Sequence, residues 1–526
     1  MAIQRRPLLR RQLLRSGLLL GAGAALPAAL ANAGPALAAP ALVRSGRPAL
    51  THGVQTGDVT AHGGVVWTRA DRPARMAVEV STRPDFARSV TMPGPVLTAE
   101  TDFTGKVKLS GLPAGSDVHY RVRLADPGDA SLVGEPVTGR LRTAPAVRDD
   151  VRFVWSADLA GQGWGINPDA GGYRIFRAMA GSDPDFFLCS GDFWYADGVI
   201  PETRTLPDGR IWRNLVTPEK SKVAETLAEF RGQHKYNLMD ENLRAFAAAV
   251  PQINQWDDHE VLNNWYPGEV LTDTRYTERR VDVLAARARQ ALFEYLPIET
   301  GPSGDGRVHR VIRYGPLLDV FVLDMRSYRD ANSANTGPAT DSGIMGAQQV
   351  AWLERELEAS RATWKVIAAD MPLSLVVPDG DAAQEAVAQG DGGAPLGREG
   401  EIARILSFIH RRHITNTVWF TADVHYTAAH YYDPDKAAFQ DFTPFWEFVS
   451  GPLNALVANQ PNKLDGTFGP QVRFQSLAPD TERNNPAYGY QFFGEVDIDG
   501  SSEVMTVRLH DIDGKVLYSV GIDPQR

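Results

Sequence analysis

Five apolar runs of the sequence each end at acidic or histidine side chains. With the residues that close them, the runs cover 151–158, 186–192, 253–260, 320–326 and 418–425. Short apolar runs bounded by polar turns predict buried strands, and open α/β sheets carry their sites at the carboxyl ends of such strands. Carboxylates gathered there would repel one another. The sequence therefore predicts a multinuclear metal site.

The closing residues differ in how strongly each indicates metal binding. Three carboxylates and an imidazole stand together at 257–260, which is costly unless a cation is near. Asp423 and His425 are two apart, so they point to the same side of an extended segment. Asp192 follows Gly191 in a tight turn, where its carboxylate could bridge two cations, with Tyr195 three residues on. Each motif alone also occurs in ordinary turns. The presence of five such motifs at strand ends favours metal binding more strongly than any one of them.

The chemistry of these side chains narrows the cation. Carboxylate, imidazole and phenolate ligands favour hard or borderline cations over thiolate-bound zinc. Cys189 is the single cysteine of the 526 residues, which excludes an intramolecular disulfide.

The elements that must position these residues fall into two regions. From 50 to 145, short alternating strands separated by turns predict a β-sandwich of the immunoglobulin or fibronectin type. Residues 143–150 are typical of a linker. Beyond them, apolar strands alternate with helical stretches at 221–246, 277–296 and 347–360, which favours a layered α/β architecture. Hairpin signals at Asp499-Gly500 and Asp513-Gly514 predict an antiparallel edge that closes the sheet.

The first 38 residues predict an export signal. Five arginines precede an apolar stretch at 17–30, which is too short and glycine-rich for a transmembrane span. Small residues at 36–38, or alternatively 31–33, suit cleavage. Arg10-Arg11 favours the twin-arginine pathway, with an ordinary secretory signal as the alternative. Cleavage would take five of the 54 basic residues and none of the 64 acidic ones, leaving a formal charge of −15 that disfavours a stable nucleic-acid partner.

Six blocks of the chain together resemble the alkaline phosphatase D family of the calcineurin-like metallophosphoesterases. They lie at 52–58, 65–69, 191–195, 256–264, 323–329 and 423–425, in family order. The resemblance implies an α/β fold with a four-layer αββα metallophosphoesterase domain, at 148–526. It also implies a small fibronectin- or immunoglobulin-like β-sandwich before that domain, at 39–147, and a twin-arginine signal peptide at 1–38.

The resemblance also implies a cluster of iron and calcium ions. The residues carried over as metal ligands are Asp158, Asp192 (bridging), Tyr195, Asp258, Asn264, Asp423 and His425. Asn263 is an alternative to Asn264 as the amide ligand. Asp158 stands where the family pattern can have cysteine. Zinc or manganese is therefore the alternative to iron and calcium.

The expected activity is hydrolysis of phosphate mono- and diesters by metal-activated water, in a periplasmic or secreted protein. His259 would stabilise or protonate the leaving oxygen. Arg326 would clamp the phosphate oxygens, or else form a structural ion pair with an acid such as Asp324. The expected partners are the phosphate ester and the twin-arginine export machinery, with no transmembrane anchor in the mature chain. Two other classes stay open: a non-catalytic exported binding protein and an iron-tyrosinate redox enzyme.

Overall fold

A computed structural model describes residues 46–300, 306–340 and 342–526 of the chain. The predicted signal peptide, and with it the twin-arginine prediction, lies outside these residues. Among the helices that are described, none combines the length and apolar character needed to cross a membrane.

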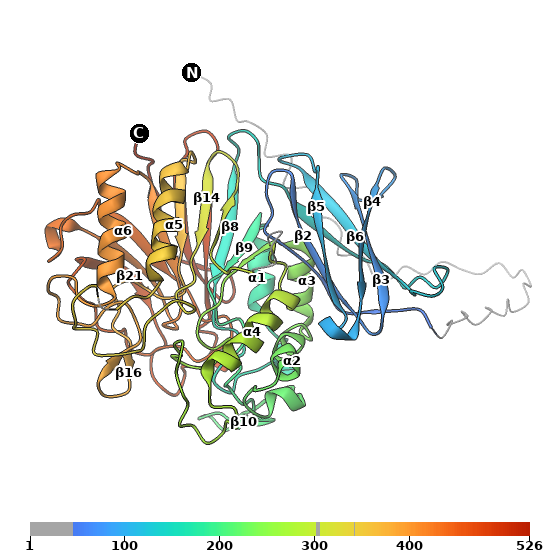
Figure 1. Ribbon diagram of the computed structural model, residues 1–526, viewed down its shortest axis with the longest axis horizontal. Coiled ribbons are helices and arrows are strands. Elements are labelled where there is room, and N and C mark those ends of the chain that lie inside the picture. Colours follow the sequence, from blue (N-terminus) through green and yellow to red (C-terminus); the bar gives the residue numbers. More distant parts are fainter. Residues whose placement is uncertain (1–45, 301–305, 341) are drawn as a thin grey trace, which may run out of the picture. The chain divides into compact units, whose positions relative to one another are not determined.

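Two large sheets form the centre of the molecule (Figure 1). The nine-stranded sheet has the order β24 (Val516–Ile522), β23 (Met505–Asp511), β22 (Phe492–Ile498), β8 (Val151–Ser156), β9 (Phe186–Cys189), β12 (Gln252–Asn254), β1 (Leu50–Gly57), β2 (Gly63–Ala70) and β5 (Thr104–Ser110). The seven-stranded sheet has the order β13 (Arg310–Arg313), β14 (Leu318–Val322), β15 (Trp364–Ala368), β18 (Thr417–Thr421), β20 (Phe445–Val449), β19 (Thr427–Tyr432) and β21 (Pro470–Ser476).

The central strands are apolar on both faces because both faces are covered. Side chains alternate along a strand, so Phe153 of β8 and Phe420 of β18 point into the space between the sheets, where their rings meet edge to face at 5.5 Å. Their neighbours Val154 and Trp419 point outward into the helical layers. This explains why the strands read as continuous apolar runs rather than as alternating ones.

Helices cover the outer face of each sheet. On the nine-stranded sheet lie α1 (Ile175–Gly181), α2 (Leu227–Asn237), α3 (Glu241–Ala249) and α4 (Val281–Tyr295), and on the seven-stranded sheet lie α5 (Gly346–Ala359) and α6 (Glu399–Arg411). The predicted four-layer αββα architecture is therefore confirmed. The helix predicted at 221–246 is wrong as a single element, because Asp240 accepts the Leu243 N–H and so caps a new helix after α2 ends.

The N-terminal region forms the expected β-sandwich. A four-stranded sheet of β4 (Val90–Leu97), β3 (Ala74–Ser81), β6 (Asp117–Ala125) and β7 (Val137–Arg142) packs on β1, β2 and β5 through a shared apolar core. β1 also pairs in parallel with β12 at Gly57 and Gln252, so one sheet runs through both regions. The linker predicted at 143–150 is wrong at its start, because residues 143–145 are buried and the Ala144 N–H donates to Thr60 O.

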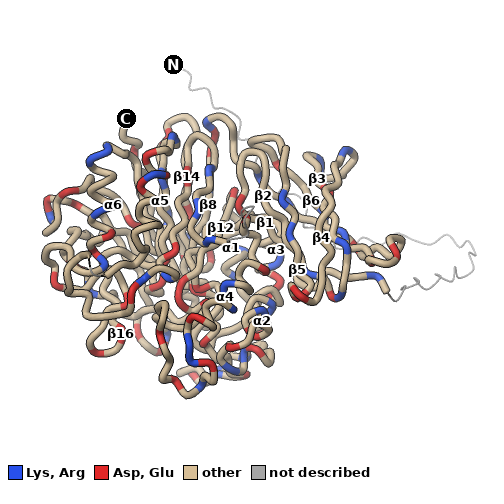
Figure 2. Tube along the Cα trace, viewed as in Figure 1, with Lys and Arg blue, Asp and Glu red and all other residues tan. Residues whose placement is uncertain are grey.

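The C-terminal strands add the predicted antiparallel edge. β22 pairs with β8 and then with β23, which pairs with β24, and the two tight connections lie at the Asp499-Gly500 and Asp513-Gly514 signals. Along the coloured trace of Figure 2, Lys and Arg are interspersed with Asp and Glu, and no continuous basic stripe is visible in this view.

Candidate metal centre

Strand ends from both sheets bring two groups of ligand atoms together. Asp158 after β8, Asp192 after β9 and His425 after β18 form the first group, and Asp192, Asp258 and His259 form the second. Within each group the ligand atoms lie within 4.8 Å of one another. Asp192 belongs to both groups, so its carboxylate lies where a bridge between two cations would be.

The carboxylates of the centre are buried and short of donors. Asp158 has 0% of its surface exposed and Asp192 has 1%. Among the described residues, no hydrogen-bond donor reaches either oxygen of Asp158, Oδ1 of Asp258 or Oδ2 of Asp423. Burial first, and neighbouring carboxylates second, raise the pKa of Asp192 well above its ordinary range. Cations satisfy such oxygens, so the donor set fits hard metal ions.

Five of the seven predicted ligands adopt a left-handed backbone conformation. Left-handed φ angles occur at Asp158 (64°), Asp192 (49°), Asn264 (58°), Asp423 (68°) and His425 (59°). Residues other than glycine adopt this region rarely, at a cost of about 1–3 kcal/mol each, and such residues cluster at functional sites. The turns therefore hold these side chains in one direction at the expense of stability.

Gly191 allows the Asp192 turn to approach its neighbour. Its φ is 100°, and a Cβ there would lie 2.4 Å from Asp257 Cβ. The turn is held by Glu260, whose carboxylate accepts the N–H groups of Asp192 and Phe193. The local sequence thus needs glycine before the aspartate and a buried acid opposite it.

Tyr195 lies beside His425, a member of the first group. Tyr195 Oη is 3.0 Å from His425 Nε2, and His425 Nδ1 is 2.5 Å from Leu456 O. A carbonyl only accepts, so His425 carries its proton on Nδ1 and turns Nε2 toward the Asp158 carboxylate, 3.7 Å away. Burial lowers the pKa of His425 to about 4.

His259 is oriented by an acid that sequence reasoning missed. Its Nδ1 lies 2.8 Å from Asp197 Oδ1, and Nε2 lies 3.9 Å from Asp258 Oδ1. Burial alone would lower the pKa of His259, but Asp197 and Asp258 outweigh it and raise that pKa to about 9. Asp197 lies five residues after Asp192, in the loop that follows β9.

The remaining predicted ligands lie at the edge of the two groups. The Asn264 N–H donates to Asp258 Oδ2 at 2.5 Å, while its side-chain Nδ2 donates to Asp379 Oδ1 at 3.0 Å. Asn263 is exposed and uses its backbone N–H on Asp197. Asp423 is half-buried and within electrostatic reach of Asp158 and Asp258, although it belongs to neither compact group.

Arg326 forms a buried ion-pair network and is not exposed to solvent. It has 0% exposure, and its guanidinium contacts Asp257, Asp370 (3.3 Å) and Glu385. Arg326 was expected either to clamp the phosphate oxygens or to form a structural ion pair. This geometry favours the structural ion pair, and the partners are Asp257, Asp370 and Glu385 instead of Asp324. Asp324 instead accepts the Trp256 indole N–H at 2.9 Å and contributes no atom to either ligand group.

Asp370 and Glu385 were missed, for different reasons. Asp370 follows β15 directly, so its run at 364–370 carries the same signal as the other five. Glu385 follows the short hairpin of β16 (Pro378–Asp379) and β17 (Ala383–Gln384), which has no local pattern to reveal it.

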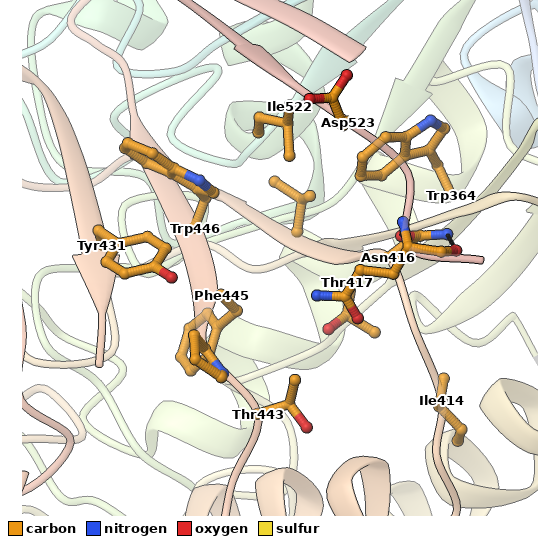
Figure 3. Close-up of a pocket in the computed structure, with 13 residues that line it drawn as sticks. Trp364, Ile414, Asn416, Thr417, Tyr431, Thr443, Phe445, Trp446, Ile522 and Asp523 are labelled. Atoms are coloured by element: carbon orange, nitrogen blue, oxygen red, sulfur yellow. Dashed lines mark hydrogen bonds between the residues drawn. The ribbon is translucent and has the colours of Figure 1, made fainter. Parts of the chain in front are cut away.

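A separate hollow of about 200 Å³ lies at the opposite edge of the seven-stranded sheet (Figure 3). Trp364, Thr417 and Trp446 line it near the beginnings of β15, β18 and β20, whereas Asp370 and Asp423 follow the ends of β15 and β18. Asp523 is its one carboxylate, too few for a multinuclear metal site.

Known proteins resemble this chain in sequence and in fold. Residues 153–509 match the PhoD-like phosphatase family, and residues 36–145 match the N-terminal domain of PhoD-like phosphatases. Alkaline phosphatase D of Bacillus subtilis (strain 168) is 29% identical over 397 residues, which cover 71% of this chain and 64% of that protein. The chain thus spans somewhat less than two thirds of the length of this curated relative.

Two solved structures show the same fold. The structure of PhoD has a TM-score of 0.66 at 21% identity and covers 90% of this chain and 89% of its own. Purple acid phosphatase PPD1 from yellow lupin (Lupinus luteus) seeds has a TM-score of 0.56 at 12% identity, over 91% of this chain and 74% of its own. Since the family match extends over more than half of the sequence, this chain belongs to the PhoD-like phosphatase family.

Proposed function

We propose that this protein is an exported, metal-dependent phosphoesterase that hydrolyses phosphate mono- and diesters. The observation that carries the proposal is the shared position of Asp192, which joins two groups of buried ligand atoms from strands of both sheets. Family membership supports the reaction class.

The residues that would hold the ions are Asp158, Asp192, Tyr195, Asp258, Asn264, Asp423 and His425. When bound, the ions would lower the pKa of water and neutralise charge on the phosphoryl oxygens. Iron and calcium are the proposed ions, with zinc or manganese in reserve, because carboxylate, amide and phenol oxygens dominate the donor set and the single thiol, Cys189, is buried behind the turn.

His259 would act on the leaving oxygen. Asp197 accepts from Nδ1, so Nε2 is the ring atom turned to Asp258. From there it can stabilise charge on the departing oxygen or hand it a proton. Arg326 would act indirectly, by offsetting the charge of Asp257, Asp370 and Glu385 beneath the ligands.

Export through the twin-arginine pathway to the periplasm or medium is part of the proposal. It rests on the paired arginines and the apolar stretch of residues 1–38. Fusing residues 1–38 to a reporter, with Arg10 and Arg11 replaced by lysine as the control, tests it: loss of export in the control supports the pathway.

The activity is tested by metal analysis of the purified protein together with nitrophenol release from mono- and bis-nitrophenyl phosphate. Bound metal with turnover of either ester supports the proposal, and the ratio of the two rates ranks diester against monoester. Metal-free, inactive protein would overturn it in favour of a binding protein. Bound iron without ester turnover would favour redox chemistry at Tyr195.

A further inference from the structure

We propose that Asp379 is a positioning residue of the metal centre, which fixes the side-chain amide of Asn264 so that its oxygen faces the second ligand group. The inference rests on the proposed function and adds a residue outside the six family-like sequence blocks. Asp379 ends β16, on a short hairpin far along the chain from the motifs that supply the ligands.

Both carboxylate oxygens of Asp379 accept hydrogen bonds from asparagine side chains. Its Oδ1 accepts the Asn264 Nδ2–H at 3.0 Å, and its Oδ2 accepts the Asn332 Nδ2–H at 2.9 Å. Asn332 also donates to Asn264 O at 2.8 Å. Both oxygens of the carboxylate are thus used on two amides, and Asn264 is held at its side chain and its backbone.

These contacts decide the orientation of the Asn264 amide. A carboxylate accepts hydrogen bonds and does not donate, so the amide nitrogen must face Asp379 and the amide oxygen must face away. An amide oxygen is a ligand for hard cations, whereas the NH₂ group is not. Without Asp379, the amide could turn over and present its nitrogen to the ions.

Through Asn264, the hydrogen bonds of Asp379 extend to a second predicted ligand, Asp258. The Asn264 N–H donates to Asp258 Oδ2 at 2.5 Å, and Asn264 adopts a φ of 58°. Arg398 in turn holds Asn332 through a 2.8 Å bond from Nη2 to Oδ1. The Asp379 carboxylate is therefore the middle of a chain of hydrogen bonds that runs from Arg398 through Asn332 to Asn264 and Asp258. Partners of this kind typically contribute 10- to 100-fold to metal affinity.

Calcium titration of metal-stripped protein by calorimetry tests the inference without depending on turnover. We expect Asp379→Ala to weaken the tightest calcium site about 10- to 100-fold. Asp381→Ala is the matched control, because Asp381 is an exposed acid on the same hairpin, and it should leave affinity unchanged. In an Asn264→Ala background, Asp379→Ala should cost much less affinity than in the wild type, since Asp379 acts mainly through the Asn264 side chain.

Unchanged calcium affinity in Asp379→Ala, or a loss that is fully retained in the Asn264→Ala background, would overturn the inference. If the wild-type protein binds no metal, the proposed function fails instead, and the two failures are distinguishable. Should Asp379→Ala not fold, as judged by near-UV circular dichroism, Asp379→Asn is the second variant. It keeps the shape but offers one acceptor oxygen for two donors, so a smaller loss is expected and wild-type affinity would contradict the inference.

Discussion

Asp197 and His259 form a hydrogen-bonded pair that fixes the imidazole of the second ligand group. Asp197 Oδ1 lies 2.8 Å from His259 Nδ1, and Asp197 Oδ2 accepts the Asn263 N–H at 3.0 Å. The pair fixes the ring so that Nε2 lies on the side of Asp258. A histidine held in this way keeps one ring orientation, with its Nδ1 proton donated to Asp197.

Asp197→Asn should lower kcat about 10- to 100-fold with little change in KM, because the amide no longer stabilises a charged His259 ring. Steady-state kinetics on nitrophenyl phosphate measures this, with metal content determined in parallel. Asn263→Ala is the control, since Asn263 contributes only its backbone N–H to Asp197. A kcat within twofold of wild type in Asp197→Asn would refute the role.

Asp192→Ala should remove metal from both ligand groups, whereas Asp158→Ala should affect the first group alone. The reason is that Asp192 belongs to both groups and Asp158 to one. Metal content after gel filtration in chelator-free buffer measures the difference. Equal loss in the two variants would contradict a bridging position for Asp192.

The sequence predicted the strand ends that carry the candidate ligands because their signal is local. Burial of a strand on both faces gives a continuous apolar run, and a ligand placed where the strand stops gives a charged residue at a fixed place. Asp158, Asp192 and His425 were found in this way, and they do meet. The same physics explains why Asp324 was included: it follows the end of β14, but it accepts the Trp256 indole N–H and joins neither ligand group.

The sequence could not show what depends on contacts between distant segments. Nothing near Arg326 identifies Glu385, 59 residues away, as its partner. Likewise, the pairing of Gly57 with Gln252 that joins the β-sandwich to the second region leaves no pattern in either strand. The break between α2 and α3 was detectable in principle, because Asp240 is a good N-cap residue within an otherwise helical stretch.

Arg326→Met should destabilise the protein by about 3–5 kcal/mol, because it leaves Asp257, Asp370 and Glu385 buried without their common cation. Arg404→Met is the control, since the Arg404–Glu354 pair lies at the surface with Arg404 52% exposed and should matter by less than about 1 kcal/mol. Denaturant unfolding of both variants gives the comparison. Metal-stripped Arg326→Met should have the lowest free energy of unfolding of the proteins compared. Equal losses of stability in Arg326→Met and Arg404→Met would contradict the network.

Glu399 should give the protein a pH-dependent stability that is separate from the metal centre. It lies in the first turn of α6, and its Oε2 accepts from Leu396 N at 3.1 Å and Gln389 Nε2 at 3.2 Å. Burial first, and then the charges of Asp465 and Asp391, raise the pKa of Glu399 from 4.5 to about 8.

The raised pKa determines the direction of the effect. Between pH 4.5 and about 8 the folded protein keeps the Glu399 proton that the unfolded chain has lost, so the free energy of unfolding is highest below this window and falls as pH rises through it. One proton corresponds to about 1.4 kcal/mol per pH unit. Glu399→Gln cannot titrate, so its stability should fall less steeply between pH 5 and 8. Denaturant midpoints across that range, compared with wild type at equal metal content, test this, and parallel curves for the two proteins would show that Glu399 is ionised in the folded state.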